Sequence, residues 1–263
     1  MRLTTGQFFG TADRQIECDG ISMSARHYEP FHEQPWHSHE RTTLFVQLVG
    51  DHHDETSSGE WRMPNLSLIY HPTQMPHRSR LGPFGAGGVN IELSAAWLAK
   101  NEVDEHDLGC ARVLQTHAAK SAALRVIRIY EAEPEVDDLM VELIETLVED
   151  RKPSETPWLS RVEERIQAEF RGPIGLAALS HTAGVHRVHV ARVFRNRHGH
   201  SVTEHIQRLR VQAAVEQILA GDTIGSSAIE AGFSDQFHFT RTLKAHFGYC
   251  PKLVKRLQCF NRS

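Results

Sequence analysis

The chain of 263 residues is predicted to be an α+β multidomain protein, with a β-rich N-terminal part and an all-α C-terminal part. From Arg14 to about Leu93, short apolar runs are separated by turn residues, which is typical of a small antiparallel sandwich or barrel. From Ser94 to Asp150 the spacing of apolar residues becomes helical. From about Gly175 to Leu257, one helical pattern occurs twice. These three regions predict a sheet, a helical segment and a repeated helical unit, in that order along the chain.

The repeated pattern is the most specific feature of the sequence. In the first copy, Gly184 stands eight residues after the first apolar position, and Arg192 stands eight residues further on. In the second copy, Gly232 and Arg241 follow at spacings of eight and nine. A closing glycine comes seven residues after the arginine in both copies. The matching offsets indicate that one structural unit is repeated.

Each copy has the residues that a helix-turn-helix requires. A small residue, Ser180 or Ala228, precedes the glycine by four positions and is predicted to lie where two helices cross closely. The glycine is predicted to adopt a positive φ. The following helix has an apolar stripe and a basic, polar outer face. One copy alone would be equally compatible with an ordinary helical hairpin, whereas two copies favour a pair of binding helices.

The charge is divided along the chain. Residues 157–263 carry 15 Lys and Arg against 8 Asp and Glu, a net charge of +7, whereas residues 1–156 carry 14 against 25, a net charge of −11. A basic half that also contains the repeated helices is predicted to bind a polyanion. The four cysteines are scattered, which indicates reduced thiols and a cytoplasmic location. No signal peptide or membrane span is expected.

The second copy carries a family resemblance. The segment Gly232–Pro251 resembles the signature of the AraC/XylS (arabinose-regulator) family of transcription factors, and the region 159–256 is similar to that family's DNA-binding domain. Ser227 replaces a residue that is usually apolar, and Phe237 one that is usually small and polar. The resemblance implies a sequence-specific, double-stranded DNA-binding regulator, and not an enzyme. In activators of this family RNA polymerase is a further partner.

The resemblance also implies which side chains face DNA. Arg192 and Arg241 are expected either to read bases or to anchor on phosphates. Phe237 is expected either to contact thymine methyl groups or to pack in the core and compensate for Ser227. Phosphate contacts are expected from Arg195 and Lys244. The full expected set is Arg187, Val188, Ala191, Arg192, Arg195, Gln236, Phe237, His238, Arg241 and Lys244.

The N-terminal part contains two segments that resemble the motifs of the cupin barrel. Pro35–His39 is similar to the first motif, and Pro72–His77 is similar to the second, with Gln74 where glycine is usual. Metal-binding cupins carry a glutamate at a position that here falls on Thr43 or Leu44. The resemblance implies a cupin-like β-barrel that binds a small-molecule effector.

Five side chains are candidates for effector binding: Trp36, His37, His39, Tyr70 and His77. The three histidines could together hold zinc or another divalent metal. They could equally line a ligand pocket or cap strand ends. No cofactor is expected, because the fourth ligand, the carboxylate, is missing. Trp36 and Tyr70 are expected either as apolar pocket walls or as ordinary core.

Other segments give weaker predictions. His52 and His53 are expected at a turn, facing solvent, and Arg80–Gly88 is expected as a flexible loop. An acidic amphipathic helix from about Glu135 is expected to form a homodimer, with packing on the barrel as the alternative. Its apolar stripe consists of Val136, Leu139, Met140, Leu143, Ile144 and Leu147.

The expected domain organisation follows from these assignments. Residues 1–150 form the effector-binding and dimerisation domain, with a barrel at about 14–93 and helices at about 94–150; residues 151–157 form a linker; and residues 158–263 form the DNA-binding domain. Two other hypotheses remain open. One is a metal-dependent cupin enzyme with an appended domain, and the other is a constitutive DNA-binding protein whose barrel serves only for dimerisation.

Overall fold

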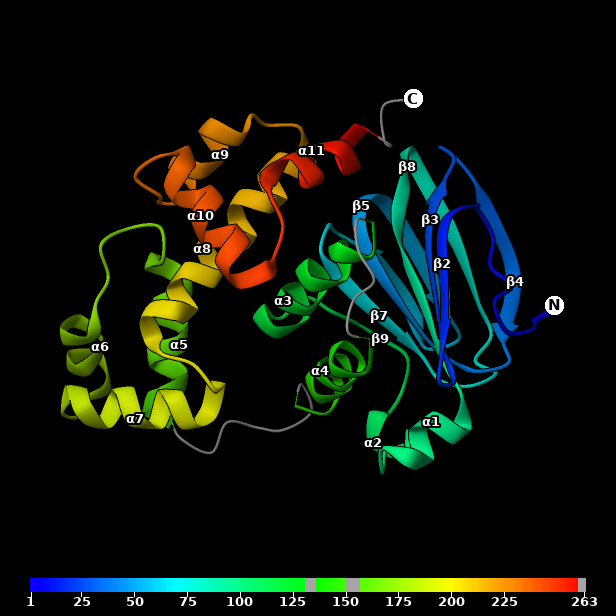
Figure 1. The fold of residues 1–263 in the computed structure, drawn as a ribbon. Helices are drawn as coiled ribbons and strands as arrows, with labels where there is room; N and C mark the ends of the chain where they lie inside the picture. The colour runs from blue at the N-terminus through cyan, green and yellow to red at the C-terminus, as the bar shows by residue number, and fades with distance from the viewer. Residues whose placement is uncertain (131–135, 150–156, 260–263) are drawn as a thin grey trace. The chain divides into compact units, whose positions relative to one another are not determined.

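The computed structural model of the chain describes residues 1–130, 136–149 and 157–259. The chain divides into two compact units, residues 1–151 together with 252–263, and residues 152–251. Figure 1 shows strands in the first unit and helices in the second. The predicted fold class, a sheet-rich N-terminal part followed by a helical C-terminal part, is confirmed. No helix among the described residues has the length and apolarity needed to span a membrane.

The first unit contains nine strands in one hydrogen-bonded sheet. Two of them are long, β5 (Thr42–Thr56) and β8 (His77–Leu93), and they pair antiparallel along most of their lengths. The others are β1 (Arg2–Leu3), β2 (Thr11–Cys18), β3 (Ile21–Tyr28), β4 (Glu33–His39), β6 (Gly59–Met63), β7 (Ser67–His71) and β9 (Arg112–Leu114). The pairings among the described strands leave this sheet open, whereas a closed barrel was expected.

The long strands each take part in two layers, because their pairing changes at a bend. The first half of β5 pairs with β7, and its second half pairs with β6. The first half of β8 pairs with β4, and its second half pairs with β3. The bend in β5 is at Gly50, whose φ is +107° and where an added Cβ would lie 2.2 Å from the Gly85 carbonyl oxygen. Only glycine fits this approach of the two strands.

Two predictions fail in these long strands. Arg80–Gly88, expected as a flexible loop, lies within β8, with a register shift against β5. His52, expected at a solvent-facing turn, is a buried residue of β5, while His53 is half-buried. In both cases local composition favoured a turn, but pairing between distant strands extended the ladder. A turn at Ser57–Ser58 joins β5 to β6.

The helical segment of the first unit begins with α1 (Ala95–Lys100), where the Ser94 side chain accepts a hydrogen bond from the Trp97 amide and so caps the helix. It continues with α2 (Glu105–Leu108), α3 (His117–Val126), a 3-10 turn (Ile127–Tyr130) and α4 (Val136–Glu149).

The apolar stripe of α4 is buried within the chain itself, and α4 contacts α3 and α2. The stripe therefore packs within the chain, against helices, whereas the alternative to dimerisation was packing on the barrel. Homodimerisation remains a prediction that needs another surface.

The described residues of the second unit form six helices: α5 (Pro157–Glu169), α6 (Leu176–Ala183), α7 (Arg187–His198), α8 (Val202–Ala220), α9 (Ile224–Glu230) and α10 (Gln236–Phe247). A last helix, α11 (Pro251–Cys259), begins at a proline, which the first turn of a helix tolerates. The predicted linker, residues 151–157, lies outside the described residues except for Pro157, which begins α5.

Candidate DNA-binding surface and histidine cluster

The first helix-turn-helix consists of α6 and α7. Gly184 ends α6 with φ +68°, as predicted. Helix α7 buries Val190 and Phe194 and exposes its opposite face. Ser180 was expected at a close helix crossing but is only half-buried, with its hydroxyl donating to the Ala177 carbonyl. Ala183 is the small residue that α6 buries.

The second helix-turn-helix consists of α9 and α10. Gly232 has φ +94°, again as predicted, and Ala228 is fully buried. Ser227, unusual for the family, is buried with its hydroxyl donating to the Thr223 carbonyl at 2.8 Å, so the polar group is satisfied. The Asp235 carboxylate caps α10 by accepting from the His238 amide at 2.7 Å, and this bond lowers the pKa of Asp235.

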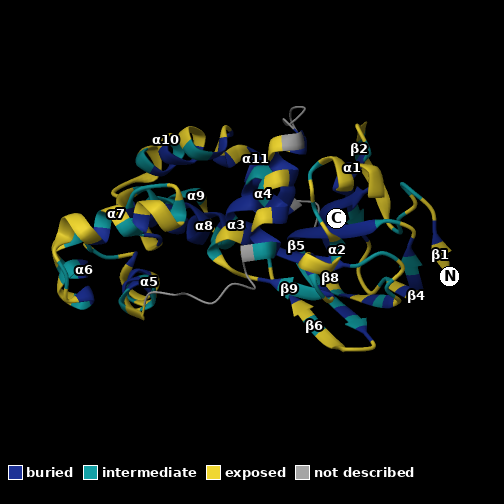
Figure 2. Cartoon of the chain, turned by 90° about the horizontal axis from the view of Figure 1, so that it is seen from below, coloured by how far each residue is buried: buried dark blue, intermediate teal, exposed yellow. Residues whose placement is uncertain are grey.

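Helix α8 connects the first helix-turn-helix to the second and holds them apart. A capping box begins it, because the Ser201 hydroxyl accepts from the Glu204 amide and Glu204 accepts from the Ser201 amide. Gly221 follows its last turn. Most of the helix is buried, as its dark blue colour in Figure 2 shows. At about 1.5 Å per residue its 19 residues span about 28 Å.

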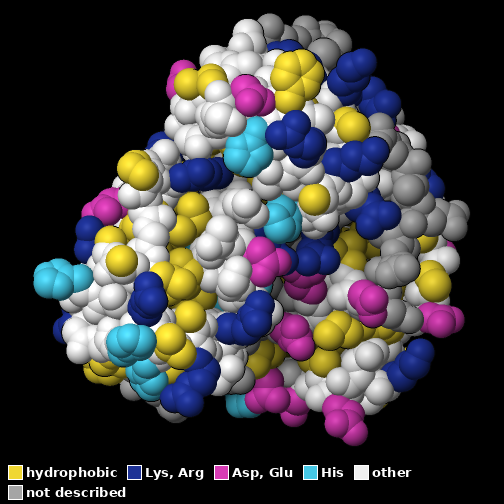
Figure 3. All heavy atoms as spheres, turned by 60° about the vertical axis from the view of Figure 1, so that its left-hand side comes forward, with side chains coloured by type: hydrophobic (Ala, Val, Ile, Leu, Met, Phe, Trp, Pro, Cys, Tyr) yellow, Lys and Arg dark blue, Asp and Glu magenta, His cyan; other side chains and the backbone are white. Residues whose placement is uncertain are grey.

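None of the ten expected DNA-contact residues is buried. Ala191 and His238 are half-buried, and the other eight are exposed: Arg187, Val188, Arg192, Arg195, Gln236, Phe237, Arg241 and Lys244. Phe237 is 75% exposed, which contradicts core packing as its role. Figure 3, turned so that the side with α6 and α7 comes forward, shows Lys and Arg side chains exposed over much of that face.

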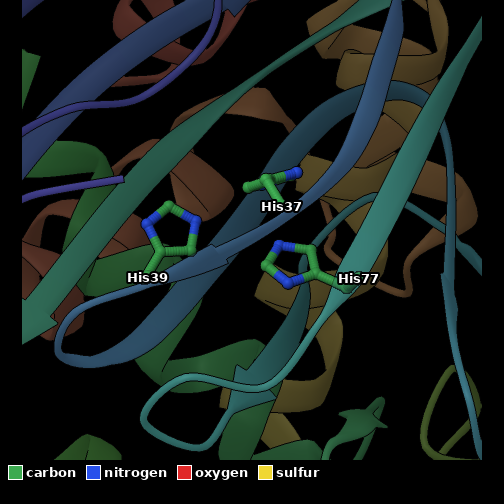
Figure 4. A group of neighbouring side chains, drawn as sticks. All are labelled: His37, His39 and His77. Atoms are coloured by element: carbon green, nitrogen blue, oxygen red, sulfur yellow. The ribbon is translucent and has the colours of Figure 1, made fainter. Parts of the chain in front are cut away.

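The first unit encloses a group of polar side chains between its two layers. A small cavity of about 30 Å³ is lined from β4 by His37 and His39, from β5 by His52 and Asp54, and from the other strands by residues that include His71 and His77. His37 and His77 are direct cross-strand partners. Figure 4 shows His37, His39 and His77 close together, and one possible ligand atom from each lies within 4.8 Å of the others.

A buried carboxylate lies beside this cluster. Asp54 accepts hydrogen bonds from His71 Nε2 at 2.9 Å and from the Ser79 hydroxyl at 2.9 Å. The His71 ring stacks on the His77 ring with centroids 3.8 Å apart. Burial raises the pKa of Asp54, and the surrounding histidines oppose this rise. Asp54 and His71 were not predicted, although His52, Asp54 and Thr56 share one strand face by alternation, which is a signal that the sequence offered.

Burial also controls the charge of the histidines. It lowers the pKa of His37 to about 4, of His52 to about 4 and of His71 to about 3. Burial likewise lowers the pKa of His77 well below its ordinary value. These rings are therefore neutral at physiological pH, the form in which imidazole can accept a hydrogen bond or bind a metal.

The structure does not bring all five expected effector residues together. Trp36 is 43% exposed and lies under the Arg78 guanidinium, away from the cavity. Tyr70 is fully buried but points away from the cavity, because its strand neighbours Ile69 and His71 line it. Only the three histidines of the set meet in one place.

A larger hollow of about 830 Å³ opens on the surface of the first unit. Its lining includes Thr42 and Leu93 at strand ends, residues of α1, and the loop before α2. Four carboxylates and Arg41 are among its lining side chains; the carboxylates are Glu40, Glu102, Asp104 and Glu105. Glu105 accepts hydrogen bonds from the Thr73 amide and the Thr42 and Thr73 hydroxyls. The volume falls in the range of small-molecule sites.

Comparison with known proteins agrees with the geometry of the second unit. A family profile described as a helix-turn-helix domain matches residues 179–256. No curated protein matches the chain. Among solved structures, ToxT from Vibrio cholerae is 11% identical over 92% of this chain and 99% of its own, with a TM-score of 0.39.

Two shorter structures are similar to part of the chain. An AraC-type DNA-binding regulator from Chromobacterium violaceum is 22% identical over 39% of this chain and 92% of its own, with a TM-score of 0.37. A Listeria innocua protein of unknown function is 25% identical over 38% of this chain and 95% of its own, with a TM-score of 0.34.

The second unit thus belongs to the class of paired helix-turn-helix DNA-binding domains. In particular, the helix-turn-helix profile matches residues 179–256, which contain the segment Gly232–Pro251.

Proposed function

We propose that the protein is a sequence-specific transcription regulator that binds DNA through α7 and α10 and responds to a small molecule bound by its N-terminal unit. The observation that supports DNA reading most directly is the pair of equivalent helices, each with an exposed polar face and an apolar face held in the core. Arg192 and Arg241 occupy matching positions on these exposed faces. An arginine can pair bidentately with guanine, and each such pair is worth about 1–3 kcal/mol of discrimination.

The test is selection of bound sequences from a random duplex library, followed by affinity measurement on the selected site. Arg192→Ala and Arg241→Ala should each weaken binding and relax sequence preference at one position. Arg128→Ala is a matched control, because Arg128 is an exposed arginine of the other unit. If the wild-type protein selects no preferred sequence at moderate salt, the proposed function is wrong.

The open hollow beside α1 and α2 is the proposed effector site. The enclosed histidine cavity of about 30 Å³ is far below the ~300 Å³ of the smallest usual ligand pockets. The acidic lining of the hollow favours a polar or cationic molecule. Promoter binding with and without a library of polar metabolites tests this assignment. The double variant Glu40→Gln/Glu102→Gln should weaken the response but leave effector-free DNA binding intact. If no compound changes DNA binding, the constitutive alternative holds.

Three further features belong to the proposal. The protein acts in the cytoplasm, where bacterial DNA lies. A second copy of the chain is a partner through a surface other than the buried α4 stripe, which sedimentation of the protein with and without its DNA site would detect. RNA polymerase is the partner if the protein activates transcription, which reconstituted transcription from the selected site would reveal.

A further inference from the structure

We propose that His37, His39 and His77 bind a divalent first-row transition metal ion inside the first unit. This site is separate from the DNA-binding surface and from the open hollow, so it goes beyond the proposed function. Imidazole nitrogens are preferred ligands of zinc, iron, nickel and copper, but not of magnesium or calcium. The assignment depends on how the three rings are held, on the charges around them and on the size of the cavity.

The rings are held with one nitrogen facing the protein. His37 Nδ1 lies 2.8 Å from the Pro35 carbonyl oxygen, and His77 Nδ1 lies 3.2 Å from the Met75 carbonyl oxygen. A carbonyl can only accept, so Nδ1 of each ring carries the proton and Nε2 has a free lone pair. Metal-binding histidines typically donate their other N–H to a carbonyl or a carboxylate in this way.

The third ring, His39, faces a carboxylate instead of a carbonyl. Its Nδ1 lies 3.5 Å from Glu92 Oε1, and both atoms are buried without a hydrogen-bond partner. A small rotation would close this contact and complete a carboxylate–histidine–metal arrangement. Glu92 is also the cross-strand neighbour of Thr43. The carboxylate missing from Thr43 is therefore supplied by the adjacent strand, as a positioning residue for His39.

The charges and the volume fit an ion. Asp54 lies beside His71 and Glu92 beside His39, and both carboxylate side chains are at most 1% exposed. Each carboxylate also accepts one hydrogen bond from a neutral donor, the Ser79 hydroxyl for Asp54 and the Gly6 amide for Glu92. Buried carboxylate oxygens lose the solvation that water provides, and a cation held in the same cavity would supply an opposite charge close to them. The cavity of about 30 Å³ holds an ion with a water molecule and is too small for an organic molecule. This volume also argues against the metal-dependent enzyme as an alternative.

The geometry requires a modest contraction on binding. The candidate ligand atoms lie within 4.8 Å of one another, whereas ligands around a tetrahedral zinc with bonds of about 2.1 Å are about 3.4 Å apart. Small changes of side-chain torsion can supply this difference.

The first experiment uses the full-length wild-type protein. After extensive dialysis against Zn²⁺ and then against metal-free buffer, it should retain about one equivalent of zinc. Its melting temperature should rise with Zn²⁺ concentration, but not with Mg²⁺ or Ca²⁺. The Co²⁺-loaded protein should show visible absorption of low-symmetry cobalt, and X-ray absorption should show three imidazole nitrogens. The spectroscopic measurements need no variant, so they decide the question even if a variant fails to fold.

The second experiment compares variants at constant fold, checked by circular dichroism. His37→Asn and His77→Asn should each lose retention of zinc and the zinc-dependent rise in melting temperature. Glu92→Gln should still bind zinc, about 10- to 100-fold more weakly, with a changed cobalt spectrum. His52→Leu is the matched control, because His52 is a buried histidine of the same cavity outside the ligand set, and it should retain zinc like the wild type.

The proposal is overturned if the wild-type protein retains no zinc and its melting temperature does not depend on Zn²⁺. It is equally overturned if the His37→Asn, His77→Asn and His52→Leu variants all retain zinc as the wild type does, since the ion would then lie elsewhere.

Discussion

The charge of His52 depends on whether the chain is folded. Its side chain lies inside the sheet, 5% exposed, and neither ring nitrogen has a hydrogen-bond partner. Burial lowers its pKa to about 4, whereas in the unfolded chain the ordinary value of 6.5 applies. Between these two values the unfolded state binds a proton that the folded state does not. The free energy of unfolding therefore falls as the pH falls through this window.

Replacing this residue should change both the stability and its pH dependence. His52→Leu removes two unpartnered nitrogens, so at about pH 7 it should raise the free energy of unfolding by about 1 kcal/mol. As the pH falls from 6.5 to about 4, the wild-type free energy of unfolding should decrease more steeply than that of the variant. The two slopes should differ by up to about 1.4 kcal/mol per pH unit. Urea unfolding of the metal-free proteins at about pH 7 and about pH 5 measures both effects. Parallel pH profiles would contradict the prediction.

Phe237 is a large apolar side chain that is exposed to solvent. A phenylalanine that is 75% exposed contributes little to the core, so Phe237→Ala should change stability by less than about 0.5 kcal/mol. If the ring contacts a thymine methyl group, the same change should weaken binding to the selected site about 5- to 10-fold. Ile229→Ala is the control, because Ile229 is 56% exposed on α9 and outside α10. Equal affinity of the Phe237→Ala variant and the wild type would count against a role in reading DNA.

At the scale of elements, the two turn glycines look alike in sequence but differ in their surroundings. A Cβ added at Gly184 would meet nothing within 4 Å, whereas one added at Gly232 would lie 2.3 Å from the Arg171 carbonyl oxygen. Both have positive φ, so alanine costs about 1–2 kcal/mol at either position. At Gly232 the steric conflict with a carbonyl adds to that cost.

The expected loss of unfolding free energy is therefore about 1 kcal/mol for Gly184→Ala and about 2–4 kcal/mol for Gly232→Ala. Chemical denaturation of the two variants compares them directly. If the two variants lose similar amounts of unfolding free energy, the backbone near Arg171 accommodates the added methyl group and the predicted steric cost is wrong.

The elements also show what a sequence can predict. The helices of the second unit follow from local signals, such as the glycines after α6 and α8 and the apolar spacing within α7 and α10. The continuation of β5 past Gly50 does not, because it depends on pairing with β8, some thirty residues later in the chain. For the same reason three of the cavity's histidines were predicted from a motif, but His71, Asp54 and Glu92 were not. These residues reach the cluster through strand pairing that no local window contains.

At the scale of the whole molecule, the charge is the dominant feature. The basic residues 157–263, with a net charge of +7, are joined to a part with a net charge of −11. Affinity for DNA should depend steeply on salt, since each phosphate contact contributes about −0.9 to the slope of log K against log salt concentration. The acidic part should limit nonspecific association with nucleic acid, because like charges repel.

A variant at Lys244 measures how much one basic side chain contributes to DNA affinity and to its salt dependence. It lies exposed in the last turn of α10, where a phosphate contact is expected. Lys244→Ala should weaken binding to all sequences alike and reduce the salt slope by about one. Arg128→Ala should leave the slope unchanged. A change in sequence preference for Lys244→Ala would instead indicate that this side chain reads a base.

The continuity of β5 and β8 through both layers of the first unit restricts how its interior can move. Neither layer can separate alone, because β5 and β8 belong to both layers. Separation would break the backbone hydrogen bonds that these two strands form with each other and with their neighbours. Amide protons on the two sides of the cavity should then exchange with solvent as one cooperative unit. A metal ion must therefore reach the enclosed histidines through local motion of the side chains that line the cavity. Its binding and release should be slow compared with the binding and release of a small molecule in the open hollow.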